Sequence, residues 1–453
     1  MKILESNLFN EINSFIGAIQ EKTDNIRQNS FILSKIDLFI LISIILTFVV
    51  STFCSTNVIG YVSALVPILV TIKVLMTKGE KIELEKCNFF LLIYLLICLI
   101  SNFTSSMIPQ SLYGFMKTLI YFGFYFALCQ FLKNNRNYIP FLIFIIAILM
   151  GIEGIIGLIQ NAFGLENIST WQDLSYVNPE DVLSRVYGTL QPLNPNLFAG
   201  YLIAGISALA GLSAVYLINK KHLQTITALI LFLITGFTLF LTGCRGAYLA
   251  VLVMGLLAIW ASYNIIFKTL DNDKYKKLWK ISITVLIIGS VLFMLINHGI
   301  WQRLMSIFIL RGDSSTSFRM NVYHSAFQMF HDNFLYGIGV GNKVFREIYG
   351  LYMLSGFDAL SCYSVFLEMA VESGIFALIA YLMFLGTLII NTFKKFINSC
   401  DINLKIILLI ALISIIGVMV HGLFDTIYFR PQVQYIFWTM AAILTVLIRK
   451  SEN

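Results

Sequence analysis

The stretch DLFILISIILTFVVSTFCS, residues 37–55, contains one charged residue, Asp37, and is otherwise almost entirely apolar. A helix of about 20 such residues crosses a lipid bilayer. Of the 453 residues in the chain, 58% are hydrophobic and 12% are charged, whereas a soluble domain carries about 25% charged residues. A chain of this composition cannot bury its apolar surface in a water-soluble core, so the sequence predicts an integral membrane protein.

Comparable runs recur along the chain and predict an all-α polytopic membrane protein with about twelve transmembrane helices. The candidate spans lie near residues 37–55, 57–76, 88–104, 111–132, 139–161, 196–217, 223–243, 246–267, 280–297, 361–391, 405–424 and 432–449. Within residues 1–36, apolar residues from Leu4 to Ile19 recur at helical spacing and predict an N-terminal amphipathic cytoplasmic segment. This segment either lies on the membrane surface or packs against the bundle, and residues 37–453 form the transmembrane domain.

The distribution of basic residues predicts the orientation, because lysine and arginine accumulate in the cytoplasmic loops of membrane proteins. With the N-terminus inside, 22 of the 31 basic residues fall on the cytoplasmic side. The connections on that side are also short and basic. We therefore expect a multi-pass protein with both termini in the cytoplasm.

Lysines and arginines separate across this membrane: nineteen of 21 lysines fall inside, but seven of ten arginines fall outside. Orientation alone does not explain this difference, whereas the planar guanidinium fits phosphate and carboxylate groups. Four outer arginines adjoin a glycine or proline next to a span and are candidates for anion binding: Arg185, Arg245, Arg319 and Arg430. The alternative is that outer arginines pair with loop acids, which we favour for the other three: Arg303, Arg311 and Arg346.

Two long connections, residues 162–195 and 298–360, lie on the predicted outer side. The first ends in Asn194-Pro195-Asn196, a turn in which either asparagine is suited to cap the next helix. The second is a large extracytoplasmic loop in which residues 317–330 predict an amphipathic helix with Phe318, Val322, Phe327 and Phe330 on its apolar side. In YGIGVGN, residues 336–342, backbone N–H groups are available either to bind an anion or simply to form a turn.

Ionisable side chains close to the outer ends of two spans are further candidates for a site. Glu368 and Glu372 are four residues apart on one helix face, and we expect them to pair with arginine because acids at membrane depth are costly. His421 and Asp425 are also four residues apart, which predicts a shared helix face beside Arg430. For both pairs, a structural lock between helices is the alternative to a functional pocket.

The seven cysteines show no spacing typical of metal ligands, and most fall within apolar runs. There a thiol behaves as a small apolar side chain. We expect no metal and no other cofactor.

Several motifs in a fixed order carry a resemblance to a known family. They are Gly188-Thr189 followed by Asn194-Pro195-Asn196, then Thr242-Gly-Cys-Arg-Gly-Ala247, Arg319 ahead of Gly337-Ile-Gly-Val-Gly-Asn342, Glu372-Ser-Gly374, and His421 with Asp425. This order, over residues 185–440, resembles the O-antigen ligase and polymerase superfamily of bacterial membrane glycosyltransferases. Residues 351–374 and 421–431 are similar to the subgroup labelled an inorganic-carbon (bicarbonate) transporter in cyanobacteria.

The resemblance implies a location and a chemistry. It implies a protein of the bacterial cytoplasmic (inner) membrane that moves a glycan from a polyprenyl diphosphate carrier to an acceptor glycan on the outer face, without metal. Its partners are these two glycans and the lipid bilayer, and no nucleic acid is expected. By resemblance, Arg185, Arg245 and Arg319 hold the diphosphate, with Arg430 and Asn196 beside them.

One departure from the family pattern concerns the catalytic base. Ligases and polymerases commonly carry His-Asn eleven residues before the glycine that corresponds to Gly374, where this chain has Tyr363-Ser364. Tyrosine is a poor base, with an ordinary pKa of about 10. The remaining candidates for this role are Glu368, Glu372 and the pair of His421 and Asp425. The departure also fits an anion transporter for bicarbonate, in which Glu153 is the main candidate for ion coupling.

Overall fold

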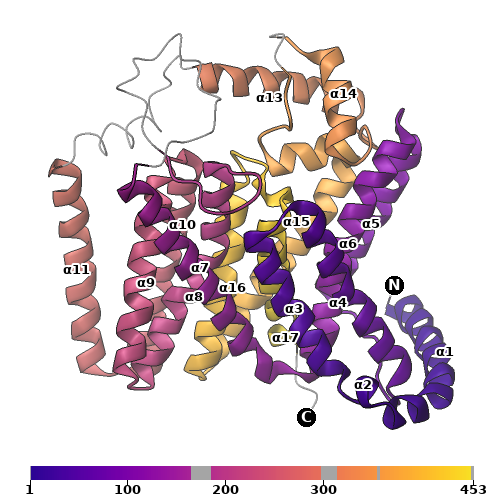
Figure 1. Ribbon diagram of the computed structural model, residues 1–453, viewed down its shortest axis with the longest axis horizontal. Helices are drawn as coiled ribbons and strands as arrows, with labels where there is room; N and C mark the ends of the chain where they lie inside the picture. The colour runs from indigo at the N-terminus through magenta and orange to yellow at the C-terminus, as the bar shows by residue number, and fades with distance from the viewer. Residues whose placement is uncertain (1, 165–184, 297–313, 355–357, 450–453) are drawn as a thin grey trace.

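The computed structural model describes residues 2–164, 185–296, 314–354 and 358–449, and in this part of the chain every regular element is a helix (Figure 1). In chain order the elements are α1 Lys2–Asn29, α2 Phe31–Ser34, α3 Ile36–Phe53, α4 Thr56–Met76, α5 Lys86–Thr104, α6 Ile108–Asn134, η1 Arg136–Tyr138, α7 Ile139–Ala162, α8 Pro195–Ile218, α9 His222–Leu241, α10 Arg245–Asn264, η3 Ile265–Leu270, α11 Asp273–Ile296, α13 Ser314–Asp332, α14 Asn342–Tyr352, α15 Val365–Asn398, α16 Ile402–His421, η4 Ile427–Phe429 and α17 Pro431–Ile448.

Eleven helices in the described residues are long and apolar enough to cross a membrane. The predicted all-α polytopic membrane protein is therefore confirmed. The span expected at 280–297 corresponds to α11, which is not among the eleven and ends where the described residues stop. The span expected at 361–391 begins later, at Val365, because Ser364 before it is extended, and it continues to Asn398.

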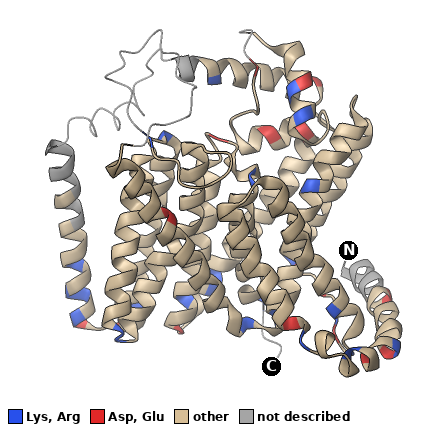
Figure 2. Cartoon of the chain, viewed as in Figure 1, with Lys and Arg blue, Asp and Glu red and all other residues tan. Residues whose placement is uncertain are grey.

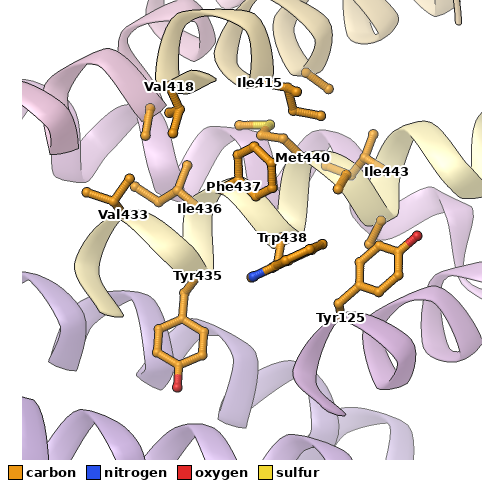
Figure 3. Close-up of a cluster of buried hydrophobic side chains, with 14 of the residues drawn as sticks. Tyr125, Ile415, Val418, Val433, Tyr435, Ile436, Phe437, Trp438, Met440 and Ile443 are labelled. Atoms are coloured by element: carbon orange, nitrogen blue, oxygen red, sulfur yellow. The ribbon is translucent and has the colours of Figure 1, made fainter. Parts of the chain in front are cut away.

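The centre of the bundle is α17, whose membrane window is 89% buried. It packs against α3, α6, α8, α15 and α16, and its aromatic residues fill the space between them (Figure 3). The ring of Trp438 lies 4.7 Å from that of Phe122 and 5.1 Å from that of Tyr125, centroid to centroid. Because lipid tails are as apolar as these side chains, such packing and hydrogen bonds between helices hold the bundle together.

Serines hold α8 against α16 in this way. Ser207 Oγ donates to Ile410 O over 2.9 Å, and Ser414 Oγ donates to Ala204 O in the opposite direction. All four residues are buried. These bonds fix the relative position of the two helices that later contribute Asn196 and His421 to the site.

Helix α1 packs against α4 and the turn after it. Gln20 donates to Val74 O over 2.7 Å and accepts from Gly79 N over 3.1 Å, while Thr23 Oγ1 donates to Leu75 O over 2.9 Å. The segment is helical and packs against the bundle, while its amphipathic, cytoplasmic character stays a prediction. Phe15 remains 70% exposed on an adjacent face, so contact of that face with the membrane surface stays a prediction.

Helices α13 and α14 lie across one end of the bundle, and α1 and α2 lie at the other (Figure 1). Lysine and arginine residues, drawn in one colour, collect at the end that carries α1 and α2 (Figure 2). In the connections 78–86, 133–136, 220–221 and 268–280 these basic residues are mostly lysine. We call this the lysine end and the opposite one the arginine end. In α13, Val322 is buried as predicted, but Phe327 is 61% exposed, so its place on the predicted packing face was wrong.

Candidate functional site

The chain enters α8 through a non-helical segment, residues 185–194, which we call the strap. Val186, Gly188 and Leu190 of the strap are buried, so its first part, residues 185–190, runs between helices, whereas residues 191–194 are exposed. Non-helical backbone at membrane depth needs protein partners for its polar groups, because lipid offers none. The helices around the strap supply these partners.

Gln160 of α7 binds the strap through three hydrogen bonds. Its Oε1 accepts from Tyr187 N over 3.1 Å and from Gly188 N over 3.0 Å, and its Nε2 donates to Gly188 O over 3.0 Å. Glu153 lies two helical turns before Gln160 on α7, and its Oε2 accepts from Thr189 N over 3.1 Å. Gly188 has a φ of +64°, and a Cβ there would lie 2.6 Å from Glu153 Oε2, so only glycine fits.

Arg185 is the first residue of the strap and lies at the arginine end. Arg185 Nε donates to Thr242 O and Nη2 donates to Asn196 Oδ1, both over 2.6 Å. Asn196 is in the first turn of α8, where its N–H donates to the capping side chain of Asn194 over 2.7 Å. The predicted helix cap is therefore at Asn194, and Asn196 instead orients a guanidinium.

The turn from α9 to α10 continues the site. Gly243, with φ +64°, allows the Arg185 side chain to pass within contact distance. Cys244 precedes the first residue of α10, and its buried Sγ lies 3.4 Å from Nε2 of His421. Arg245 is the first residue of α10 and is exposed at the arginine end.

Helix α16 ends at His421, so the prediction that His421 and Asp425 share a helix face is wrong. After His421 the chain turns through Gly422, and Asp425 follows in this turn. Asp425 Oδ2 lies 3.8 Å from Nη2 of Arg319. The Arg319 guanidinium also lies over the ring of Tyr363, 5.4 Å from its centroid.

Two hydrogen bonds join this turn to the segment before α15. Val365 N donates to Gly422 O over 2.7 Å, and Thr426 Oγ1 donates to Ser361 Oγ over 2.7 Å. Tyr363 lies within this segment and has a left-handed φ of +51°. Burial and the nearby charge of Asp425 raise the pKa of the Tyr363 hydroxyl, which makes this residue a still poorer base.

Among the residues that the structure describes, neither glutamate of α15 pairs with arginine as expected. Glu368 Oε2 accepts from Cys362 N over 3.1 Å, and Glu372 Oε1 accepts from Gly341 N over 2.9 Å. The glycine turn 336–342 therefore binds a carboxylate of the protein itself. Gly337 and Gly339 bring this turn against the backbone around Glu372, where a Cβ at Gly337 would lie 2.4 Å from Glu372 C.

The described contacts thus connect most of the predicted site residues. One group of contacts joins Arg185, Asn196, Thr242, Cys244 and His421, and another joins Asp425, Arg319 and Tyr363. The charges of His421 and Asp425 connect the two groups. Arg430 lies apart from these contacts as the residue before α17, and its charge acts on Glu368. Sequence reasoning missed Gln160 and Cys244, since a glutamine or cysteine within an apolar run carries no local signal of its partner.

Residues 230–382 match a protein-family model described as O-Antigen ligase. This match supports a relation to the O-antigen ligase superfamily. It covers Cys244, Arg245, Arg319 and the glutamates of α15, whereas the strap and the turn after His421 lie outside it. The match gives no support to the inorganic-carbon transporter subgroup. No curated protein matches the chain. With its eleven candidate spans, the chain is a multi-pass membrane protein with a ligase-like or polymerase-like region.

Proposed function

We propose that this protein transfers a glycan from a polyprenyl diphosphate carrier to a hydroxyl group of an acceptor glycan at the arginine end. The observation that carries this proposal is the gathering of Arg185, Cys244, His421, Asp425, Arg319 and Tyr363 through contacts and, between His421 and Asp425, through their charges. These residues join the ends of α8, α10, α16 and α13. The family match over residues 230–382 is consistent with it. In this proposal the protein lies in the bacterial cytoplasmic membrane with both termini in the cytoplasm, and the arginine end faces outward.

The arginines have the role of holding the diphosphate. Arg185, Arg245 and Arg319 supply planar donors that suit phosphate oxygens, with Arg430 at the edge. Asn196 and Thr242 O orient Arg185 in advance, which lowers the cost of reorganisation when charge develops on the leaving group. In this way guanidinium groups neutralise the diphosphate without a metal.

The base is best assigned to Asp425, with His421 as its neighbour. Glu368 and Glu372 are less suited to act as the base, because their carboxylates are buried and accept backbone N–H groups. Tyr363 is also less suited, because its pKa is raised. In the reaction, the acceptor oxygen bonds to the anomeric carbon and its proton passes to the Asp425 carboxylate. The bond from this carbon to the diphosphate oxygen breaks, and its electron pair leaves with the diphosphate. Tyr363 positions Arg319 by stacking beneath it.

The test compares Arg319→Ala with Arg346→Ala in proteoliposomes that contain polyprenyl diphosphate-linked glycan and acceptor. Arg346 is also at the arginine end, but it pairs with Asp358 in an exposed contact. Loss of one charge-stabilising donor lowers a rate by about 10²–10³-fold, so we expect this loss for Arg319→Ala and nearly normal transfer for Arg346→Ala.

Normal elution and thermal unfolding of both variants serve as the folding control. Undiminished transfer by Arg319→Ala would refute the proposed clamp. If the purified protein carried labelled bicarbonate into liposomes and transferred no glycan, the function would instead be anion transport.

A further inference from the structure

Two buried cysteines at the arginine end have opposite surroundings. Cys244 is 6% exposed and its Sγ lies 3.4 Å from Nε2 of His421, which is 3% exposed. Cys362 is fully buried, and its nearest described charges are the carboxylates of Glu368 and Glu372. Both thiols are free, so the pair offers a matched comparison within one protein.

The groups that face Cys244 come from four elements. They are His421 from α16, Arg185 from the strap, Asp425 from the turn after α16, and the N-terminus of α10, which carries a partial positive charge. Arg319 in turn faces His421. Among these groups Asp425 is the one negative charge described, and it also lies beside Arg319, so the surroundings of the sulfur favour an anion.

Burial by itself raises the pKa of the Cys244 thiol, but the charge and hydrogen bond of His421 outweigh it, so this pKa lies below its ordinary value. At Cys362 burial and the two glutamates act in the same direction and raise the pKa well above its ordinary value. The thiolate is the nucleophilic form of cysteine, and thiolates are found next to histidine and at helix N-termini.

We propose that Cys244, activated by His421, is a modification site for small electrophilic sulfur compounds, such as thiosulfonates and disulfides. The Cys244 sulfur attacks the electrophilic sulfur and forms a new S–S bond. The bond from that sulfur to its leaving group breaks, and a sulfinate or thiolate departs with the electron pair. The proton given up by the thiol stays on His421 Nε2. This chemistry does not depend on the glycan-transfer proposal.

The experiment treats the full-length protein in detergent micelles with methyl methanethiosulfonate and measures each cysteine adduct by peptide mass spectrometry from pH 6 to pH 8. Cys400, which is exposed, serves as the accessible comparison, and Cys362 serves as the buried control. For an ordinary thiol, with a pKa of about 8.5, the thiolate fraction and the rate fall about tenfold per pH unit below that value. We expect the Cys244 rate to fall less steeply with pH than the rate of Cys400, because its pKa is lowered, and Cys362 to stay unmodified.

His421→Gln should restore the ordinary pH dependence at Cys244, and Cys244→Ser should remove the adduct from that peptide alone. The pH profile of the unaltered protein is decisive even where the His421 variant does not fold. The proposal is overturned if Cys244 stays unmodified while Cys400 reacts completely, or if its rate follows pH as steeply as that of Cys400.

Discussion

Lys73 at the lysine end and Arg185 at the arginine end are held by different kinds of partner. At the lysine end, Lys73 Nζ is buried 2.7 Å from Asp37 Oδ1 and 3.7 Å from Glu80 Oε1. At the arginine end, Arg185 is held by a carbonyl oxygen and an amide oxygen. The carboxylates offset the charge of Lys73, whereas the two oxygens that orient Arg185 are neutral. Arg319, at the same end as Arg185, lies 3.8 Å from the carboxylate of Asp425. The arrangement at Lys73 suits a lock between helices, and that at Arg185 suits recognition of an anion.

The lysine end extends this lock to the last spanning helix. Arg449, just after α17, pairs with Glu83, and its Nε lies 3.3 Å from Glu85 Oε1. Lys133 of α6 shares Glu83 over 2.7 Å. These contacts fasten the ends of α6 and α17 to the turn before α5. At the arginine end a comparable fastening uses backbone hydrogen bonds and close glycine packing, which makes the two ends sensitive to different substitutions.

The largest effect on stability is expected from Gly337→Ala at the arginine end, with Gly79→Ala at the lysine end as its control. Both glycines have positive φ, +71° and +84°, but a Cβ at Gly337 meets the Glu372 backbone at 2.4 Å, while nothing lies within 4 Å at Gly79. Backbone strain costs about 1–2 kcal/mol at either position, and overpacking adds about 1–3 kcal/mol at Gly337 alone. Thermal unfolding in detergent should show the difference, and equal losses would contradict the role assigned to this turn.

A smaller effect is expected from Gln160→Ala, which removes the partner of two strap amides. Buried backbone groups that lose their partner cost about 1–3 kcal/mol, so we expect a loss of about 2 kcal/mol and faster deuterium exchange at Tyr187 and Gly188. Glycan transfer should fall as well, because the strap carries Arg185. The control is Gln130→Ala at the lysine end, where an exposed side chain donates to Lys81 O. Unchanged exchange at Tyr187 would show that Gln160 does not hold the strap.

These examples also show how far the sequence could predict the molecule. The spans follow from apolar runs whose length is set by the bilayer, and Asn194 caps α8 through contacts within three residues. Both depend on local chemistry, so both could be predicted. The end of α16 at His421 could not be predicted, because the apolar pattern continues through Leu423 and Phe424. The contact between Gly422 and Val365 joins residues far apart in the sequence.

The candidate site was predictable as a set of residue types and not as an arrangement. The difference between arginine and lysine positions singled out Arg185 and Arg319, whose described partners lie near His421 and Asp425, and their role in anion binding stays a prediction. The partners of Glu372 were predicted wrongly, because its bond to Gly341 N joins residues 31 positions apart and no local pattern records it. The bond of Gln160 to the strap is of the same kind, with 28 positions between the partners.

The smallest effect is expected from Arg449→Ala, which tests the lysine end as a lock. The side chains of Arg449, Glu83 and Glu85 are 21%, 36% and 31% exposed, and exposed ion pairs contribute about 0–1 kcal/mol. Glu83 also keeps Lys133 as a partner, so the free energy of unfolding should fall by less than about 1 kcal/mol and less in high salt. Glycan transfer should not change, in contrast to Arg319→Ala, which should lose transfer at similar stability. If Arg449→Ala abolished transfer in a folded protein, the lysine end could not be purely structural. Removal of an ion-paired arginine at that end would then affect the reaction at the arginine end.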